Sequence, residues 1–190
     1  MQLIIFDLDD TLFKTAAKIL VFNGSKLVKR LSSSEYQSYE LANGEHFDYR
    51  EFKDSSLFYK TSIPISETIE TLRNFLKYKV DDSKVIIITA RPDLDDKETF
   101  LDTFRKFDIA IDKVFIERAG NHRRKTSAEN KLIVFEKYVA TKKYSEVIIF
   151  DDLFENLEAF LSLKIKYPDI VFKAFLVSST SNATQVNRVK

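Results

Sequence analysis

The segment MQLIIFDLDDTLF, residues 1–13, is the part of the sequence that indicates the fold class most clearly. Its apolar run ends at Phe6, and three carboxylates follow within four positions: Asp7, Asp9 and Asp10. A short, continuous apolar run with β-branched residues is typical of a strand that is buried on both faces of a parallel sheet. Ligands of open α/β sheets bind outside the carboxyl ends of the strands, so these acidic residues predict a functional site.

Further segments repeat this pattern and alternate with amphipathic stretches. The predicted strands are LIIF (3–6), KVIIIT (84–89), KVFIE (113–117), EVIIF (146–150) and, at or near a sheet edge, VFKAFLV (171–177). The predicted helices cover residues 65–79, 95–107, 126–139 and 154–165, and Thr126 and Glu129 have the spacing of a capping box. Alternating strands and helices predict a doubly wound, mainly parallel, Rossmann-like α/β sheet with right-handed crossovers.

Residues 14–62 interrupt this alternation. Asn23-Gly24 lies between two apolar-rich runs, which is a strong signal for a β-hairpin. Residues 32–41 are typical of a short helix, and residues 46–62 are predicted to be irregular or weakly helical. Because the apolar content of 14–62 is too sparse for a core of its own, we expect a single domain, 1–190, with a flap hairpin and small cap insertion over the sheet edge.

The amino-acid composition limits which partners and which cellular compartment we expect. The 190 residues carry a net charge of +1, so only a local patch could attract a polyanion. The chain has no Cys, which excludes disulfides and thiolate catalysis. No basic leader and no apolar run of about 18 to 20 residues is present, so we expect a soluble, cytoplasmic protein without a membrane partner.

Polar residues follow the other predicted strands as well. They are Thr89 and Arg91 after the second strand, Lys125 and Lys131 after the third, and Asp151 and Asp152 after the fourth. Carboxylates at this density repel one another unless a hard cation neutralises them, and oxygen ligands favour Mg²⁺. The ends of the strands therefore predict a Mg²⁺ site that recruits phosphate oxygens, with one Asp available as a nucleophile.

In this order the motifs resemble those of the haloacid dehalogenase-like (HAD) superfamily of phosphohydrolases, over nearly the whole chain. DLDDT matches the first motif, and the resemblance makes Asp7 the nucleophile, Asp9 the general acid and base, and both of them metal ligands. Thr89 matches the second motif. The third is a Lys, matched best by Lys131 and less well by Lys125.

The fourth motif of the family is matched by Asp151 and Asp152. Asp152 is the preferred direct Mg²⁺ ligand, and Asp151 is expected to bind the ion through water or to position Lys131. Arg91 and Asn156 are candidate substrate-binding residues, although Arg91 could equally lie on the surface. Asp10 is expected to stay outside the site because the motif leaves its position free.

The chemistry that the resemblance implies is phosphomonoester hydrolysis through a phospho-aspartate on Asp7. The family includes small phosphatases, nucleotidases and the phosphatase modules of nucleic-acid end-repair enzymes, some of them encoded by phages. The expected substrate is a nucleic-acid end carrying a 3′-phosphate or a nucleotide, and the alternatives are a small phosphorylated metabolite or a non-catalytic receiver-like signalling module. The receiver alternative is disfavoured because receivers carry their acidic pair after the first strand, whereas here the pair comes last.

One basic patch could bind nucleic acid. The loop 118–125 contains Arg118, Arg123, Arg124 and Lys125, and it follows a parallel strand on the side of the expected site. Such a loop could follow a phosphate backbone while aromatic side chains of the insertion stack on bases. A solvated charged surface is the alternative interpretation.

Overall fold

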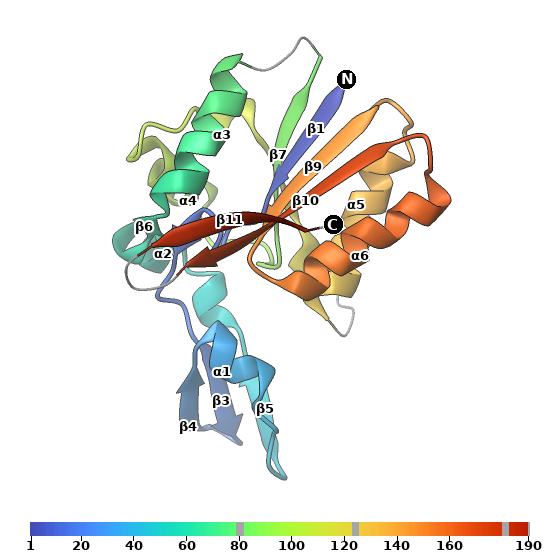
Figure 1. Ribbon diagram of the computed structural model, residues 1–190. Coiled ribbons are helices and arrows are strands. Elements are labelled where there is room, and N and C mark those ends of the chain that lie inside the picture. The colour runs from blue at the N-terminus through green and yellow to red at the C-terminus, as the bar shows by residue number, and fades with distance from the viewer. Residues whose placement is uncertain (79–81, 123–125, 180–182, 190) are drawn as a thin grey trace.

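The computed structural model describes residues 1–78, 82–122, 126–179 and 183–189, and it consists of an α/β body with a small projecting lobe (Figure 1). The strands of the body's central sheet are β1 (Gln2–Phe6), β7 (Lys84–Thr89), β8 (Phe115–Arg118), β9 (Glu146–Asp151), β10 (Val171–Ser179) and β11 (Thr184–Val189). The sheet has six strands in the order β11-β10-β9-β1-β7-β8. All neighbouring pairs are parallel except β10 and β11, which are antiparallel.

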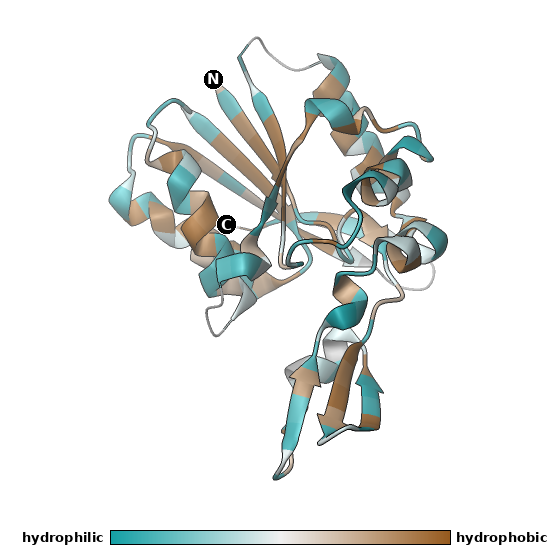
Figure 2. Ribbon diagram, turned by 180° about the vertical axis from the view of Figure 1, so that it is seen from behind, coloured by the Kyte–Doolittle hydropathy of each residue, from teal (hydrophilic) through white to brown (hydrophobic). Residues whose placement is uncertain are grey.

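Helices cover both faces of this sheet. They are α3 (Ser66–Tyr78) and α4 (Lys97–Arg105) on one face, and α5 (Ser127–Val139) and α6 (Phe154–Lys166) on the other. In β1, Leu3 and Ile5 pack toward α5 and α6, whereas Ile4 and Phe6 pack toward α3 and α4. The central strands are therefore apolar along most of their length, as Figure 2 shows. The predicted α/β class with a mainly parallel sheet is confirmed, and it is compatible with a Rossmann-like fold.

The order of the strands fixes where a ligand can bind. The chain passes from β1 to β7 and β8 on one side, and then returns to β9 and β10 on the other side of β1. The loops that follow β1 and β9 therefore lead away from each other although the two strands are neighbours, with Phe6 paired to Phe150. Such a divergence is the position at which open α/β sheets bind ligands.

The insertion leaves and rejoins the body at one short ladder. Strand β2 (Phe13–Lys14) pairs with β6 (Ile63–Pro64), which matches the predicted limits of 14 and 62. Between them lie β3 (Ile19–Asn23), β4 (Lys26–Leu31), α1 (Ser33–Gln37), β5 (Glu45–Asp48), the 3₁₀-helix η1 (Arg50–Phe52) and α2 (Ser55–Thr61). Strands β4, β3 and β5 form a three-stranded antiparallel sheet, which projects from the end of the body where the parallel strands finish (Figure 1).

The insertion is more regular than the sequence predicts. The hairpin at Asn23-Gly24 is confirmed, and Gly24 has a φ of 56°, a conformation that glycine adopts without steric cost. The stretch 46–62, predicted to be irregular or weakly helical, contains most of strand β5 and all of helix α2, whose first turn Asp54 caps. The lobe also has a small apolar cluster of its own, although the sequence predicted too few apolar residues for a core there. Its members are Ile19, Val21 and Leu31, with Tyr36, Tyr39, Phe47 and Phe52 packed against them.

The body departs from the prediction at two strands. The strand predicted at 113–117 begins only at Phe115, because residues Ile111–Lys113 form the 3₁₀-helix η2. Strand β11 was not predicted, since TQVNRV lacks a clear apolar alternation, and it places β10 second from the edge. Another 3₁₀-helix, η3 (Ala119–His122), follows β8. Within the described ranges, no helix has the length and apolar character needed to cross a bilayer.

Candidate active site at the carboxyl ends of the strands

A buried ammonium group joins the ends of β1 and β9. Lys131, on α5, donates a hydrogen bond of 2.6 Å to Asp7 Oδ1 and one of 2.7 Å to Asp151 Oδ2. The side chains of Lys131 and Asp151 are only 2% and 1% exposed. The capping box of Thr126 and Glu129, which is confirmed, fixes the first turn of α5 and so the position from which Lys131 extends. Asp151 therefore contacts Lys131, which agrees with one of the two roles expected of it.

Three carboxylates meet at this position. Asp7, Asp151 and Asp152 each offer an oxygen atom, and these oxygens lie within 4.8 Å of one another. Burial, helped by the charges of Asp151 and Asp9, raises the pKa of Asp7 from 3.8 to about 7, against the opposing charge and hydrogen bond of Lys131. Burial also raises the pKa of Asp152 well above its ordinary value, and the charges of Asp7 and Asp151 add to this effect. The carboxylates are therefore crowded beyond what one lysine neutralises.

A divalent cation fits this donor set. Three carboxylates and one ammonium leave a formal charge of −2, and all three potential ligands are oxygens, which Mg²⁺ prefers. Asn156, on α6, supports the arrangement because its Nδ2 donates to Asp151 Oδ1 at 2.8 Å. Its Oδ1 is buried without a hydrogen-bond partner among the described residues, so an acceptor is left for a donor from outside the chain, such as water bound to a cation.

Asp9 lies apart from the three carboxylates and pairs with Arg91. Arg91 donates from Nε to Asp9 Oδ2 at 2.9 Å and from Nη2 to Asp9 Oδ1 at 2.6 Å, and the Thr15 hydroxyl donates to Oδ1 at 2.7 Å. Burial disfavours the charged form of Asp9, but the charge and hydrogen bonds of Arg91, with the bond from Thr15, outweigh it and lower the pKa of Asp9. Asp9 is therefore ionised at neutral pH in this structure, and its carboxylate is not one of the three that could share a metal.

Arg91 is an internal residue. Its side chain is 1% exposed, and its guanidinium lies 5.1 Å from the centroid of the Phe52 ring and 4.7 Å from that of Phe58. It also donates to the Phe52 carbonyl at 3.2 Å. Phe52 and Phe58 belong to the insertion, so the insertion helps to position the residue that pairs with Asp9. The sequence alternative of a surface position for Arg91 was wrong, and its contacts identify it as a positioning residue for Asp9.

Thr89 ends β7 close to this pair. It is fully buried, and its Oγ1 accepts a hydrogen bond of 3.1 Å from the backbone N–H of Arg91. The loop after Thr89 packs closely on η3, where a Cβ on Gly120 would lie 2.2 Å from the Ala90 carbonyl oxygen. Asp93 and Asn121 lock the same two loops together with reciprocal hydrogen bonds of 3.0 and 3.2 Å. A glycine is therefore required at position 120 to bring the ends of β7 and β8 together.

The predicted site residues divide into three groups. The structure brings together Asp7, Asp151, Asp152 and Lys131, and it places Asp9, Thr89, Arg91 and Asn156 around them. Asn156 contacts Asp151, which makes it a positioning residue in the described arrangement. The substrate-binding candidates Arg123, Arg124 and Lys125 lie outside the described residues, so the choice between Lys131 and Lys125 rests on the observed contacts of Lys131 alone.

Two threonines were missed by the sequence prediction. Thr15 donates to Asp9, and Thr11 donates to Asp152 Oδ1 at 3.4 Å. Thr15 follows Asp9 by six positions, so a hydroxyl that reaches back to a nearby carboxylate was an available signal, whereas Thr11 and Asp152 are 141 positions apart and no local signal joins them. Asp10 stays outside the carboxylate group, as predicted; it has a φ of 57° and its backbone N–H donates to the Phe13 carbonyl at 2.8 Å.

Comparison with known proteins adds nothing to this geometry. No protein-family model matches the chain, and no match is found among curated proteins.

Proposed function

We propose that this chain is a Mg²⁺-dependent phosphomonoesterase of the HAD-like superfamily, which works through a phospho-aspartate on Asp7. The observation that carries the proposal is the group formed by the buried Asp7 and Asp151, the half-buried Asp152 and Lys131, which pairs with the first two. A site that combines a nucleophile, a site for a divalent cation and a fixed ammonium suits transfer of a phosphoryl group, whose oxygens carry several negative charges. The proposed substrate is a nucleic-acid end with a 3′-phosphate or a nucleotide; the alternative is a small phosphorylated metabolite.

In the first step, Asp7 attacks phosphorus. Lys131 donates to Asp7 Oδ1, and no hydrogen bond from a described residue reaches Oδ2, so Oδ2 is the oxygen available to form the new bond. The P–O ester bond breaks as the P–O bond to Asp7 forms, and the leaving oxygen takes a proton. Bound Mg²⁺, held by Asp7 and Asp152 with Asp151 next to it, would neutralise charge on the oxygens of the transferring group.

Asp9 is the group that moves protons. It gives its proton to the leaving oxygen in the first step, and as a carboxylate it then takes a proton from the water that cleaves phospho-Asp7. The ionised, Arg91-bound form of Asp9 suits the second step directly. Acting as an acid requires a proton that the Arg91 pair opposes, so substrates whose leaving group needs no proton should react with the least dependence on Asp9.

The test is release of phosphate from p-nitrophenyl phosphate by the purified chain with Mg²⁺. We expect Asp7→Asn to reduce kcat by at least about 10³-fold, because an amide is a poor nucleophile and a weak metal ligand. Asp10→Asn is the matched control: it alters the neighbouring carboxylate, and Asn tolerates the left-handed conformation that residue 10 adopts.

Two outcomes would contradict this proposal. If the metal-loaded wild type releases no phosphate from a broad panel of phosphomonoesters, the chain is not this kind of enzyme. A stable phosphorylated Asp7 without turnover would instead favour the receiver-like signalling module.

A further inference from the structure

Arg118, the last residue of β8, is a half-buried cation for which no described residue supplies an acidic hydrogen-bond partner. Its Nη1 is buried and has no hydrogen-bond partner among the described residues. The guanidinium lies 4.4 Å from the centroid of the Phe100 ring, and the residue as a whole is partly exposed. Buried polar atoms are normally paired, so Nη1 is a donor for which the described residues supply no acceptor.

The charged groups near Arg118 do not neutralise it. Asp93 attracts it, but the Oδ1 atom of Asp93 already accepts a hydrogen bond from Asn121. The positive charge of Arg91 repels Arg118, and Arg91 itself forms an ion pair with Asp9. Burial, with the repulsion from Arg91, lowers the pKa of Arg118 to about 10 against the opposing effect of Asp93, so the group stays protonated at neutral pH.

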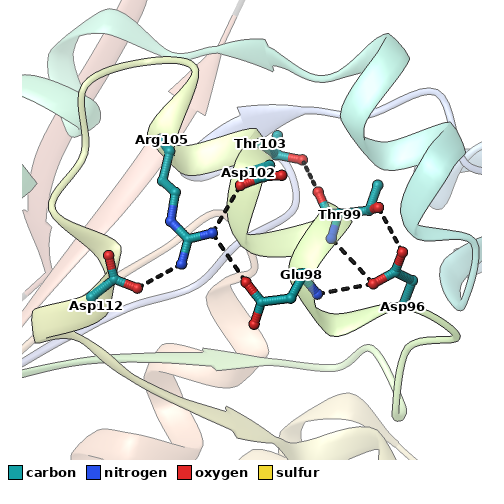
Figure 3. Close-up of polar contacts among 7 residues, drawn as sticks. All are labelled: Asp96, Glu98, Thr99, Asp102, Thr103, Arg105 and Asp112. Atoms are coloured by element: carbon teal, nitrogen blue, oxygen red, sulfur yellow. Dashed lines mark hydrogen bonds and ion pairs between the residues drawn. The ribbon is translucent and has the colours of Figure 1, made fainter.

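Arg105 shows how differently the chain treats another arginine in the same part of the body. Its guanidinium pairs with Glu98, Asp102 and Asp112 at 3.2, 2.8 and 2.7 Å, as Figure 3 shows. Arg105 is therefore neutralised by its surroundings and has no need of a ligand. Because both arginines are associated with α4, one through its backbone and one through Phe100, Arg105 is a matched control for Arg118.

Arg118 lies on the same edge of the sheet as Asp7. It is paired in register with Thr89, and in the described sheet β7 lies between β8 and β1. Two strand spacings, roughly 10 Å, therefore separate the strand of Arg118 from the strand of Asp7. Phe58 stacks on Phe100 at 5.1 Å and also contacts Arg91, so the two guanidinium groups are held by one aromatic cluster.

We propose that Arg118 binds a second phosphate group of the substrate, separate from the phosphoryl group that Asp7 receives. This inference rests on the proposed function and narrows the class of substrate. A 3′-phosphorylated nucleotide carries such a group when its O5′ is also phosphorylated, either as a phosphodiester within an oligonucleotide or as the monoester of a nucleoside 3′,5′-bisphosphate. Arginine suits this role because its planar donors match phosphate oxygens in pairs.

The experiment compares three thymidine substrates that share the 3′-phosphate: the 3′-monophosphate, the 3′,5′-bisphosphate, and the dinucleotide thymidylyl-thymidine 3′-phosphate. For wild type we expect kcat/KM to be about tenfold or more higher for a substrate with the O5′ phosphate than for the monophosphate. Arg118→Gln should reduce this preference to about twofold or less, Arg118→Lys should retain part of it, and Arg105→Gln should retain it fully. Preference for the dinucleotide alone identifies a nucleic-acid end, and equal preference for both identifies the O5′ phosphate itself.

The inference is overturned if wild type shows no preference, or if Arg118→Gln keeps the full preference while its melting temperature matches that of wild type. If Arg118→Gln unfolds, Arg118→Lys decides by the same ratio. Should none of the substrates, nor p-nitrophenyl phosphate, release phosphate, the proposed function fails and binding still tests Arg118.

Binding is measured as the Kd of a fluorescently labelled dinucleotide by anisotropy in EDTA. A Kd raised about tenfold in Arg118→Gln, with the salt slope reduced by about 1, supports the inference. An equal Kd for the variant and for wild type overturns it.

Discussion

Two charge clusters in this protein use similar contacts in opposite surroundings. Lys131 binds Asp7 and Asp151 at 2.6 and 2.7 Å with a side chain only 2% exposed, whereas Arg105 binds three acids at 2.7 to 3.2 Å with a side chain 37% exposed. Water screens the second cluster, so its pairs contribute little to folding. In the first cluster each charge depends on the others, because removing one leaves its partners buried and uncompensated. Equal distances therefore do not imply equal energies.

Removing the buried cation tests most directly whether burial makes the two clusters differ in their contribution to stability. Lys131→Met should destabilise the fold by about 3 to 5 kcal/mol, because Asp7 and Asp151 lose their shared ammonium group. Lys137→Met is the control on the same helix; Lys137 pairs with Glu117 at 2.9 Å but is 63% exposed, so its loss should cost about 0.2 to 1 kcal/mol. Urea unfolding in EDTA measures both. Equal costs for the two variants would show that burial does not distinguish the clusters.

Mg²⁺ should stabilise the fold through the cluster of Asp7, Asp151 and Asp152, and not through the acids that surround Arg105. If Mg²⁺ binds the three carboxylates, a concentration of 100 times its Kd should stabilise the fold by about 2.7 kcal/mol. Asp152→Asn should abolish most of this gain, while Asp112→Asn, which alters the exposed cluster, should retain it. Thermal unfolding with and without Mg²⁺ gives the comparison. A gain that survives in Asp152→Asn would place the ion elsewhere.

The same cluster should make stability depend on pH when metal is absent. Burial raises the pKa of Asp7 from 3.8 to about 7 in the folded state, so the folded chain holds a proton that the unfolded chain releases. The resulting stability is fully present below about pH 3.8 and is lost as pH rises through about 7. We expect the melting temperature in EDTA to fall between pH 5 and 7.5 because of this group. Asp7→Asn should flatten the fall, and an unchanged slope would contradict the assignment.

The sequence predicted the parts of this arrangement that depend on local pattern. Apolar, β-branched runs identified the parallel strands, and the residues just after them identified Asp7 and Asp151, because every parallel strand ends at the same edge. The capping box at Thr126 predicted the start of α5, and this placed Lys131 in the first turns of that helix.

The remaining contacts could not be predicted from the sequence because they join segments that are far apart along the chain. Arg91 and Asp9 are 82 positions apart, and nothing in ITARPD distinguishes an arginine that enters the core from one that stays at the surface. The position of Arg91 also depends on Phe52 and Phe58. These two rings contact Arg91 because the insertion returns to the body through the β2–β6 ladder. Strand β11 escaped prediction for the reverse reason: its polar sequence becomes a strand by pairing with β10.

Arg91 itself offers the smallest test, since it is buried like Lys131 but meets a single acid. Arg91→Lys keeps the charge but cannot supply both hydrogen bonds to Asp9, so we expect kcat to fall by about tenfold, or about 1.4 kcal/mol in the barrier. Because Lys retains the charge but no longer fixes the position of Asp9, the loss should be larger for an alkyl phosphate than for p-nitrophenyl phosphate, whose leaving group needs no proton. Arg73→Lys, at an exposed arginine on α3, is the control. An equal loss with both substrates would mean that Arg91 only supports the fold.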